Sequence, residues 1–450
     1  MTEVTRSNLV GGEMLNWSDL HPADARPAAG GPAAVSLLAA ALRAGDAVLV
    51  AGPHAAVLYA DLVAVAESVD ILVRSAPDAE ELAETLGNAK TQVYCGSLDR
   101  FETSETYDLI VALDGLERTV GPDTESLPWS EALSKLTTRL APNGRLLLGA
   151  TNSFSVNRMI QPDITAALPR DEDWGRAVND TAPAGLKALQ AELQGQIVGV
   201  YPSLVEADVM AGDNLQLTAA RAARVVAERN SGPTLLDPYR VVMDAAHAGL
   251  LVELAPAWYV AVGVEVSIES AAGELVEERL LAALRVDDQL ALRREVVAYV
   301  EWLRTAPKTG AADNVIVAGT SYRLFEGDGG GTIEEHLARF ARRALESGSR
   351  QPWPVGGDAQ ALTARLAAMV GLTVSDVPGT AEVLRPLGSA EQLATVARLA
   401  DELAHSSARA ILFQGTINGI RKSVPYRLGH AMLNPARVVR RRLKRALRRR

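Results

Sequence analysis

Short apolar runs alternate with longer segments of helical periodicity along the first third of the chain. Apolar runs with the length of strands stand at 47–51, 70–73, 91–95, 107–113 and 145–149. Segments with a helical pattern stand between them, at 32–43, 55–66, 75–87 and 129–140. Two parallel strands need a long crossover, usually a helix, so this alternation predicts βαβ units and a mainly parallel sheet.

The middle and the end of the chain show a different pattern. Strands are expected at 195–202 and 258–267, a hairpin at 314–317 and 322–325, and helices at 215–228, 237–249 and 288–304. Gly327–Gly331 has the composition of a linker, and Thr332 with Glu335 forms a capping-box pattern after it. Residues 332–412 are therefore expected to be mostly helical, with helices near 333–347, 358–370 and 389–405.

These patterns predict an α/β fold with five segments. A Rossmann-like parallel-sheet domain is followed by an α+β region and a mainly helical region. The expected bounds are an irregular lead-in at 1–32, the Rossmann-like domain at 33–160, an α+β accessory domain at 161–330, a mainly helical domain at 331–435 and a basic tail at 436–450.

Composition excludes several classes of site. The single cysteine, Cys95, excludes an internal disulfide framework and a cysteine-based zinc site. The six histidines do not pair at metal-ligand spacing, so no metal site is expected. No signal-peptide pattern begins the sequence and no apolar run reaches the roughly 20 residues of a spanning helix. We therefore expect a cytoplasmic protein.

The charge of the tail differs from that of the body. Arg437–Arg450 contains nine Lys or Arg and no acidic residue. The whole chain has a net charge of −10, so the residues before this tail carry −19. Val439, Leu443 and Leu447 would form one apolar stripe if 436–450 is helical. That pattern favours binding to an anionic membrane surface at the inner face of the cell membrane. The alternatives are an unstructured solubilising tail and nucleic-acid binding, and the acidic body argues against nucleic acid.

The turn after the first strand of the parallel sheet is the first candidate for chemistry. Open parallel sheets bind ligands outside the carboxyl ends of their strands, and a glycine there lets the backbone approach the ligand. Gly52 holds this position, in the segment Val48–Ala56. His54 lies in the same turn and is a candidate general base, with a structural hydrogen-bonding role as the alternative.

Residues 46–153 resemble a class I S-adenosylmethionine (SAM) dependent methyltransferase. The resemblance rests on the fourth-strand region Tyr107–Arg118 and on the helix-to-strand turn Leu140–Gly149, which reads Leu-Ala-Pro-Asn-Gly-Arg-Leu-Leu-Leu-Gly. It implies SAM as the cofactor, bound along the carboxyl edge of the sheet. The positions that it assigns to cofactor binding are Gly52, Arg74, Ser97, Leu98, Asp99 and Asp114.

Several of these positions depart from the family pattern. The acid of the first strand aligns with Val50, and the second and third glycines of its loop align with His54 and Ala56. The acid that binds the ribose hydroxyls aligns with Arg74, which removes a bidentate contact and adds positive charge. Arg74 could instead bind an anionic ligand such as a phosphate or nucleotide sugar. The alternative is that Arg74 is a solvated loop residue. Ser97 aligns with the acid near the adenine.

The resemblance leads to two functional hypotheses. In the first, the protein transfers a methyl group from SAM to a hydroxyl of a cell-surface polysaccharide or sugar-linked precursor. His54 or Asp114 would then be the base, although Asp114 is equally suited to a turn. In the second, it is a non-catalytic scaffold of a membrane-associated glycan-biosynthesis complex. Weaker similarity extends to a bacterial group that accompanies glycosyltransferases, which makes glycans and glycosyltransferases the expected partners.

Overall fold

The computed structural model describes most of the chain. The described residues are 7–21, 26–88, 90–121, 127–161, 181–212, 216–230, 234–268, 273–325, 329–346, 352–353, 358–374, 389–426 and 428. Contacts divide the chain into two compact units, Met1–Ser389 and Ala390–Arg450. The whole of the expected basic tail, at 436–450, lies outside the described residues.

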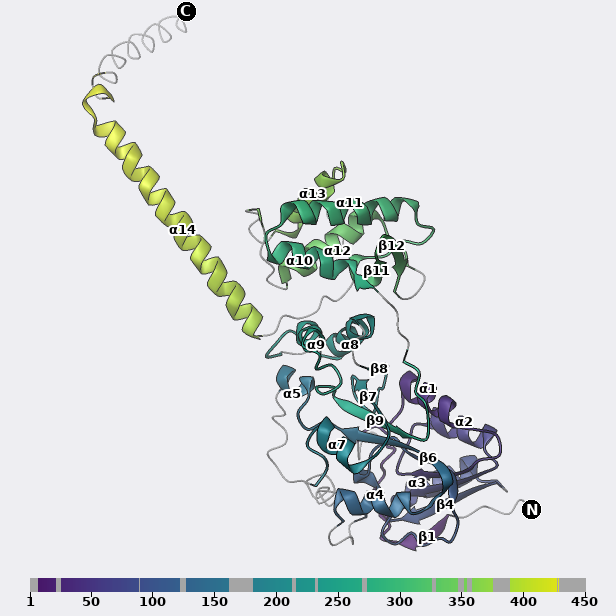
Figure 1. The fold of residues 1–450 in the computed structure, drawn as a ribbon. Helices are drawn as coiled ribbons and strands as arrows, with labels where there is room; N and C mark the ends of the chain where they lie inside the picture. Colours follow the sequence, from purple (N-terminus) through teal and green to yellow (C-terminus); the bar gives the residue numbers. More distant parts are fainter. Residues whose placement is uncertain are drawn as a thin grey trace, which may run out of the picture. The chain divides into compact units, whose positions relative to one another are not determined.

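A nine-stranded, largely parallel sheet forms the centre of the first unit (Figure 1). Its strands are β1 (Asn8–Gly11), β2 (Ala47–Ala51), β3 (Ser68–Val73), β4 (Thr91–Gly96), β5 (Tyr107–Ala112), β6 (Leu140–Thr151), β7 (Gln196–Tyr201), β8 (Val209–Ala211) and β9 (Ala257–Val262). Their order is β1-β4-β3-β2-β5-β6-β9-β7-β8. The pairs from β1 to β6 are parallel, and β9 joins β6 and β7 through antiparallel pairs. The predicted α/β class is thus confirmed.

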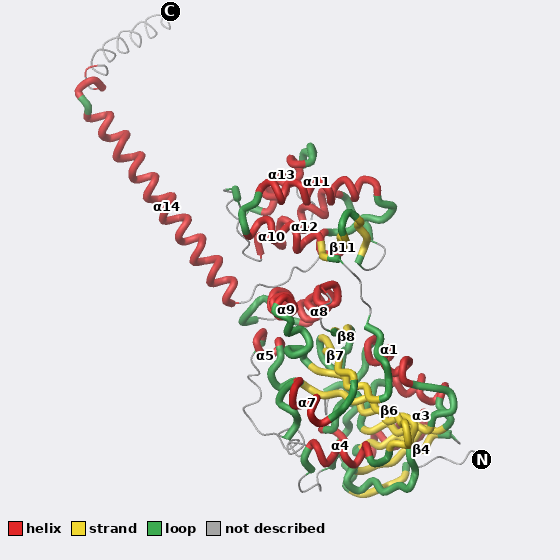
Figure 2. Tube along the Cα trace, in the orientation of Figure 1, coloured by secondary structure: helices red, strands yellow, loops and turns green. Residues whose placement is uncertain are grey.

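Helices cover both faces of this sheet (Figure 2). One face packs against α1 (Pro32–Ala41), α2 (Ala56–Val65) and α3 (Ala76–Leu86), and the other against α4 (Trp129–Thr137), α5 (Val156–Ile160), α7 (Leu186–Glu192), α8 (Gln216–Arg229) and α9 (Pro238–His247). Strand side chains alternate between the two cores, since Val48 and Val50 enter one and Leu49 and Ala51 the other. Both faces are apolar because both are buried.

The strand order reverses between β2 and β5. From β2 the chain proceeds through β3 to β4 on one side, and from β5 to β6 on the other. The crossover helices diverge at such a switch point, so the carboxyl ends of the strands there border the usual ligand position of an open α/β sheet. The turns that follow β2, β3, β4 and β5 all belong to this edge.

A second core lies later in the first unit. It contains α10 (Val276–Arg285), α11 (Gln289–Thr305), α12 (Ile333–Glu346), α13 (Ala359–Met369) and a small antiparallel sheet of β10 (Glu274–Leu275), β11 (Val315–Ala318) and β12 (Ser321–Leu324). The expected hairpin is present as β11 and β12. The capping box is present too: the Thr332 amide donates to Glu335 Oε2 (2.7 Å) and the Glu335 amide to Thr332 Oγ1 (3.2 Å).

Two expected boundaries differ from the structure. The boundary at residue 160 does not separate two sheets, because β7, β8 and β9 extend the sheet that β1–β6 begin. The lead-in at 1–32 is not irregular throughout, because β1 adds a strand to the free edge of β4. β1, β8 and β10 were not predicted: each has at most four residues, too few to show a periodicity without a hairpin turn beside them.

Candidate functional site

The expected cofactor positions meet at the carboxyl edge of the sheet. Residues 114–121, which follow β5, touch each of the three neighbouring turns. Arg74 donates a hydrogen bond to a carbonyl of this segment (3.0 Å), and Ser97 Oγ accepts one from an amide of it (3.0 Å). A Cβ atom placed on Gly52 would lie 3.5 Å from a side chain of the same segment. The structure therefore brings Gly52, Arg74, Ser97 and Asp114 together.

The chain's own N-terminal strap, residues 8–21 and 26–31, runs along this edge. After β1 pairs with β4, the Met14 amide donates to the Arg74 carbonyl (2.8 Å), beyond the end of β3. Further on, the Ala55 amide donates to the Ala29 carbonyl (2.9 Å), beyond the end of β2. The strap thus passes over the carboxyl ends of the strands at which a ligand of an open sheet would bind.

Arg74 binds the strap rather than solvent. Its Nε and Nη2 atoms donate to Asp19 Oδ2 (2.7 Å) and Oδ1 (2.8 Å), forming a bidentate ion pair. Asp19 is 1% exposed and Arg74 6%. The expectation of a solvated Arg74 is therefore wrong, and the anion that it holds in this structure is a carboxylate of the same chain.

Asp114 is the centre of a second buried ion-pair cluster. Its carboxylate accepts two hydrogen bonds from Arg118 (2.7 Å each) and two from Arg26 (2.9 and 3.0 Å), and the Ala29 amide adds another (2.8 Å). Burial by itself would raise the pKa of Asp114, but Arg26 and Arg118 hold that pKa below its usual value. Asp114 is therefore a paired anion. The strap groups that bind its carboxylate oxygens occupy hydrogen-bonding positions that a substrate would need.

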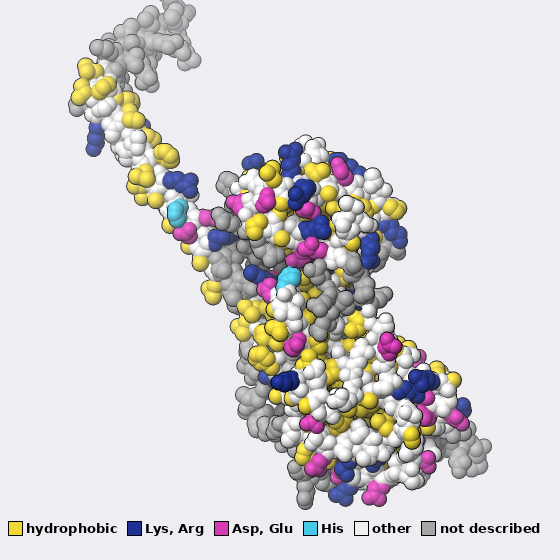
Figure 3. Space-filling model, viewed as in Figure 1, with side chains coloured by type: hydrophobic (Ala, Val, Ile, Leu, Met, Phe, Trp, Pro, Cys, Tyr) yellow, Lys and Arg dark blue, Asp and Glu magenta, His cyan; other side chains and the backbone are white. Residues whose placement is uncertain are grey.

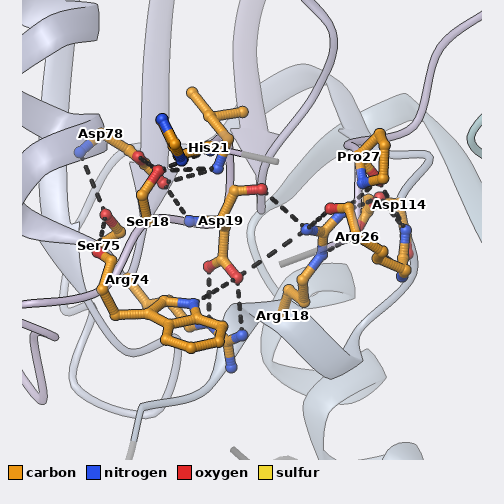
Figure 4. Close-up of polar contacts among 12 residues, drawn as sticks. Ser18, Asp19, His21, Arg26, Pro27, Arg74, Ser75, Asp78, Asp114 and Arg118 are labelled. Carbon is orange, nitrogen blue, oxygen red and sulfur yellow. Dashed lines mark hydrogen bonds and ion pairs between the residues drawn. The ribbon is translucent and has the colours of Figure 1, made fainter. Parts of the chain in front are cut away.

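Arg118 fastens the strap to the edge of the sheet. Besides its pair with Asp114, it donates to three strap carbonyls, those of Asp19 (3.0 Å), Arg26 (2.8 Å) and Pro27 (3.1 Å). Figure 4 shows the Arg118 guanidinium between Asp19 on one side and Pro27 on the other. This role was not predicted from the sequence, although the i, i+4 spacing of Asp114 and Arg118 is a signal of an ion pair.

Asp78, in the first turn of α3, holds the strap at a third point. It accepts hydrogen bonds from the Ser18 hydroxyl and from the Asp19 (2.7 Å) and Leu20 (3.2 Å) amides. An acid in the first turn of a helix is favoured by the helix dipole. The predicted cap explains its position, because Ser75 caps α3 and accepts from the Asp78 amide (3.1 Å).

His54 is committed to the backbone on both sides of its ring. Nδ1 contacts the Gly52 carbonyl (3.0 Å), and Nε2 accepts a hydrogen bond from the Leu113 amide (3.0 Å). This pattern requires a neutral ring with its proton on Nδ1. Burial lowers the pKa of His54 to about 4. In this geometry neither nitrogen is left for a substrate proton, so the arrangement favours the structural alternative over a general base.

The turn after β4 also makes its hydrogen bonds within the same chain. The Ser97 amide donates to the Gly11 carbonyl (2.9 Å), and its hydroxyl donates to Asp99. Leu98 is fully buried, and Asp99 lies 3.4 Å from Arg100 in an ion pair. Close packing against the strap extends the contact, because a Cβ on Gly12 would lie 2.9 Å from Ser97 Cβ. Three of the expected cofactor positions, Ser97, Leu98 and Asp99, are therefore engaged by contacts within the chain.

A cavity of about 570 Å³ lies beside this edge, at the carboxyl end of β6. Residues that follow β6 and β7 line it together with the end of α8, and its charged lining is Arg26, Arg158, Arg229 and Glu206. Arg229 pairs with Glu206 (3.0 Å). Arg26 links the cavity to Asp114, whereas the six expected cofactor positions are not part of its lining. Its volume suits a small molecule.

No group of three or more His, Cys, Asp or Glu among the described residues is arranged to hold a metal ion. None of the helices built from those residues is both long and apolar enough to cross a bilayer.

Comparisons with known proteins find similarity only among solved structures. No protein-family model and no curated protein matches the chain. Among solved structures, it is similar to the N-methyltransferase NodS from Bradyrhizobium japonicum WM9 in complex with S-adenosyl-L-homocysteine (SAH). The identity is 19%, the match covers 27% of this chain and 64% of NodS, and the TM-score is 0.22.

Two other SAH complexes are similar over part of the chain. One is the 1,6-didemethyltoxoflavin-N1-methyltransferase of Burkholderia thailandensis, at 21% identity over 27% of this chain and 52% of that enzyme, with a TM-score of 0.22. The other is mycolic acid cyclopropane synthase CmaA1, at 15% identity over 51% and 81%, with a TM-score of 0.27. The chain spans less than two thirds of the length of NodS in its SAH complex and of the toxoflavin enzyme. These likenesses concern the fold alone.

Proposed function

We propose that this chain is a methyltransferase-fold protein whose cofactor edge is closed by its own N-terminal strap, and that in this form it is a non-catalytic scaffold. The observation that carries the proposal is the buried Asp19–Arg74 ion pair, at the position where the family resemblance places a ribose-binding acid. A closed edge leaves the fold's other surfaces for binding.

The residues at this edge do not fit SAM as they stand. The hydrogen-bonding groups of Arg74, Asp114 and Arg118 are paired with one another, with the strap or, for Arg74, also with the Val120 carbonyl. Arg74 would also place a positive charge near the cofactor's sulfonium, where the family pattern has an acid. Binding SAM in the family's pose therefore requires the strap to leave and breaks buried ion pairs, which is strongly unfavourable when one partner stays behind.

A SAM-dependent methyltransferase whose strap opens is the second candidate. It is favoured by the convergence of Gly52, Arg74, Ser97 and Asp114 on one edge, and by the 570 Å³ cavity next to them. SAM is the cofactor of this candidate, and the cavity is the place for an acceptor. Release of the strap would free Asp114 from Arg26 but not from Arg118, since both Asp114 and Arg118 follow β5.

The cavity and the tail define the partners that we propose. Three arginines with one glutamate around the cavity favour a sugar or glycan that carries negative charge. The basic residues of 436–450 favour an anionic membrane surface, where glycosyltransferases acting on lipid-linked sugars would be the neighbours. On this proposal the protein works in the cytoplasm, at the inner face of the cell membrane.

Calorimetry with SAM and SAH separates the two candidates. The wild type and an Asp19→Asn variant are titrated with each ligand at millimolar concentration, after circular dichroism has verified that both are folded. We expect no binding by either protein. Asp288→Asn, which changes the same charge at the N-cap of α11, is the matched control.

Each positive result has a distinct meaning. Binding of SAH by the wild type would contradict the closed edge. Binding only after Asp19→Asn would favour the methyltransferase with an opening strap, and assays of methyl transfer to glycan acceptors would follow. Tight binding would also appear as a rise in the unfolding temperature, because a ligand that binds only the folded state stabilises it.

A further inference from the structure

The helix α14 (Ser389–Lys422) carries an exposed apolar stripe that the proposed function does not use. Its spacing alternates between three and four residues, which is the heptad pattern of a coiled coil. The stripe consists of Val396, Leu399, Leu403, Ala410, Phe413, Ile417 and Ile420, with Ser406 completing the repeat. The large members are 43–68% exposed within this unit. Figure 3 shows apolar side chains at intervals along the helix.

A helix of this length with such a stripe requires a partner of the same geometry. A strict 3.5-residue repeat stays on one face only when two helices wind around each other. A helix lying on a membrane has a broader apolar face, with no such repeat. The spacing therefore indicates that the stripe packs against another helix. The sizes of its side chains indicate which helix that is.

We propose that α14 forms an antiparallel coiled coil with α14 of a second copy of this chain. In a parallel pair in register, each residue of the stripe meets its own copy, so Phe413 would face Phe413 and Ala410 would face Ala410. In the antiparallel pair, Phe413 of one copy faces Ala410 of the other. Ser406 then faces Ile417, and Leu403 faces Ile420. In the first two of these pairs a small residue meets a large one, which is how helices fill a common core.

The charges favour the same orientation. A parallel pair would place two tails with nine Lys or Arg each at the same end of the coiled coil. The antiparallel pair places them at opposite ends, which removes this repulsion. Beside the stripe, Arg409 of one copy would lie near Thr416 of the other, so the pairing opposes no like charges. The contact is isologous, as expected of a twofold dimer.

The first test measures the oligomeric state of the full chain. Light scattering after size exclusion should give twice the chain mass of 47.7 kDa for the wild type. Ile417→Glu places a charge in the stripe and should give the monomer mass. Ile411→Glu makes the same change on the same helix outside the stripe, at a side chain that is 70% exposed, and should leave the dimer intact. A monomeric wild type would overturn the proposal.

The second test fixes the orientation by disulfide formation. Leu403 and Ile420 are 17 positions apart, about 25 Å along a helix. Leu403→Cys alone should not cross-link in the antiparallel dimer, whereas mixing it with Ile420→Cys should give a cross-linked pair. Cys95 is buried, so the wild type is the background. Self-cross-linking of Leu403→Cys would contradict the antiparallel arrangement. If the wild type is instead a monomer and Ile417→Glu abolishes its binding to vesicles, the stripe is a membrane-binding surface and the proposal is wrong.

Discussion

Asp19 and Arg74 form a bidentate ion pair, at 2.7 and 2.8 Å, between a strap near the N-terminus and the end of β3. The two residues are 55 positions apart and both are buried. Breaking one side of a buried ion pair leaves the other charge without a partner in a poorly solvated place, whereas replacing both with apolar groups does not.

Removal of one partner should therefore cost more stability than removal of both. We expect Arg74→Leu or Asp19→Leu alone to lower the free energy of unfolding by about 3–5 kcal/mol. The double variant should recover much of that loss. Denaturant unfolding of the three proteins forms a double-mutant cycle. Additive losses in the two single variants would mean that the pair does not hold the strap.

The pH dependence of stability should report the buried neutral state of His54. Its pKa is lowered from 6.5 to about 4, so below pH 6.5 the unfolded chain binds a proton that the folded chain refuses until about pH 4. The free energy of unfolding should consequently fall by about 3 kcal/mol as the pH drops through this window. In His54→Asn the slope between pH 6.5 and pH 4 should be smaller by one proton. Identical slopes for the two proteins would show that His54 is not buried and neutral.

The close contact between Gly12 and Gly121 makes a second stability test. A Cβ atom on Gly121 would lie 1.9 Å from the Gly12 carbonyl oxygen, which belongs to the backbone and cannot rotate away. Gly121→Ala should destabilise the fold by about 1–3 kcal/mol and loosen the strap, seen as faster hydrogen exchange of its amides.

Gly185→Ala is the matched control for this change. No atom lies within 4 Å of the position that its Cβ would occupy. Its stability should change by less than about 1 kcal/mol. An equal effect at the two positions would mean that the strap contact does not exclude a side chain.

The basic tail should decide membrane binding. Each Lys or Arg near an anionic surface contributes about 1 kcal/mol, so nine of them outweigh the acidic body. Deletion of 437–450 should abolish binding to vesicles that contain phosphatidylserine, and neutral vesicles should bind neither protein. Equal sedimentation of the full and truncated chains with anionic vesicles would refute the role of the tail.

The positions of most strands and helices could be predicted because their signals are local. The strand Ala47–Ala51 has the predicted bounds, and Ser75 caps α3 as its sequence pattern indicated. The meeting of Gly52, Arg74, Ser97 and Asp114 was also predictable, because parallel strands present their carboxyl ends at one edge. Each of these inferences uses only a periodicity of a few residues and the geometry of a parallel sheet.

The covering of that edge by the N-terminal strap could not be predicted in the same way. The strap has no periodicity of its own, and Asp19, Arg26 and Pro27 acquire their roles only when the fold places Arg74 and Arg118 beside them. Sequence by itself determined an α/β sheet with a ligand edge and departures from the cofactor pattern. Only the tertiary structure decided that the chain's own strap covers the edge, because a buried ion pair joins residues that are distant along the chain.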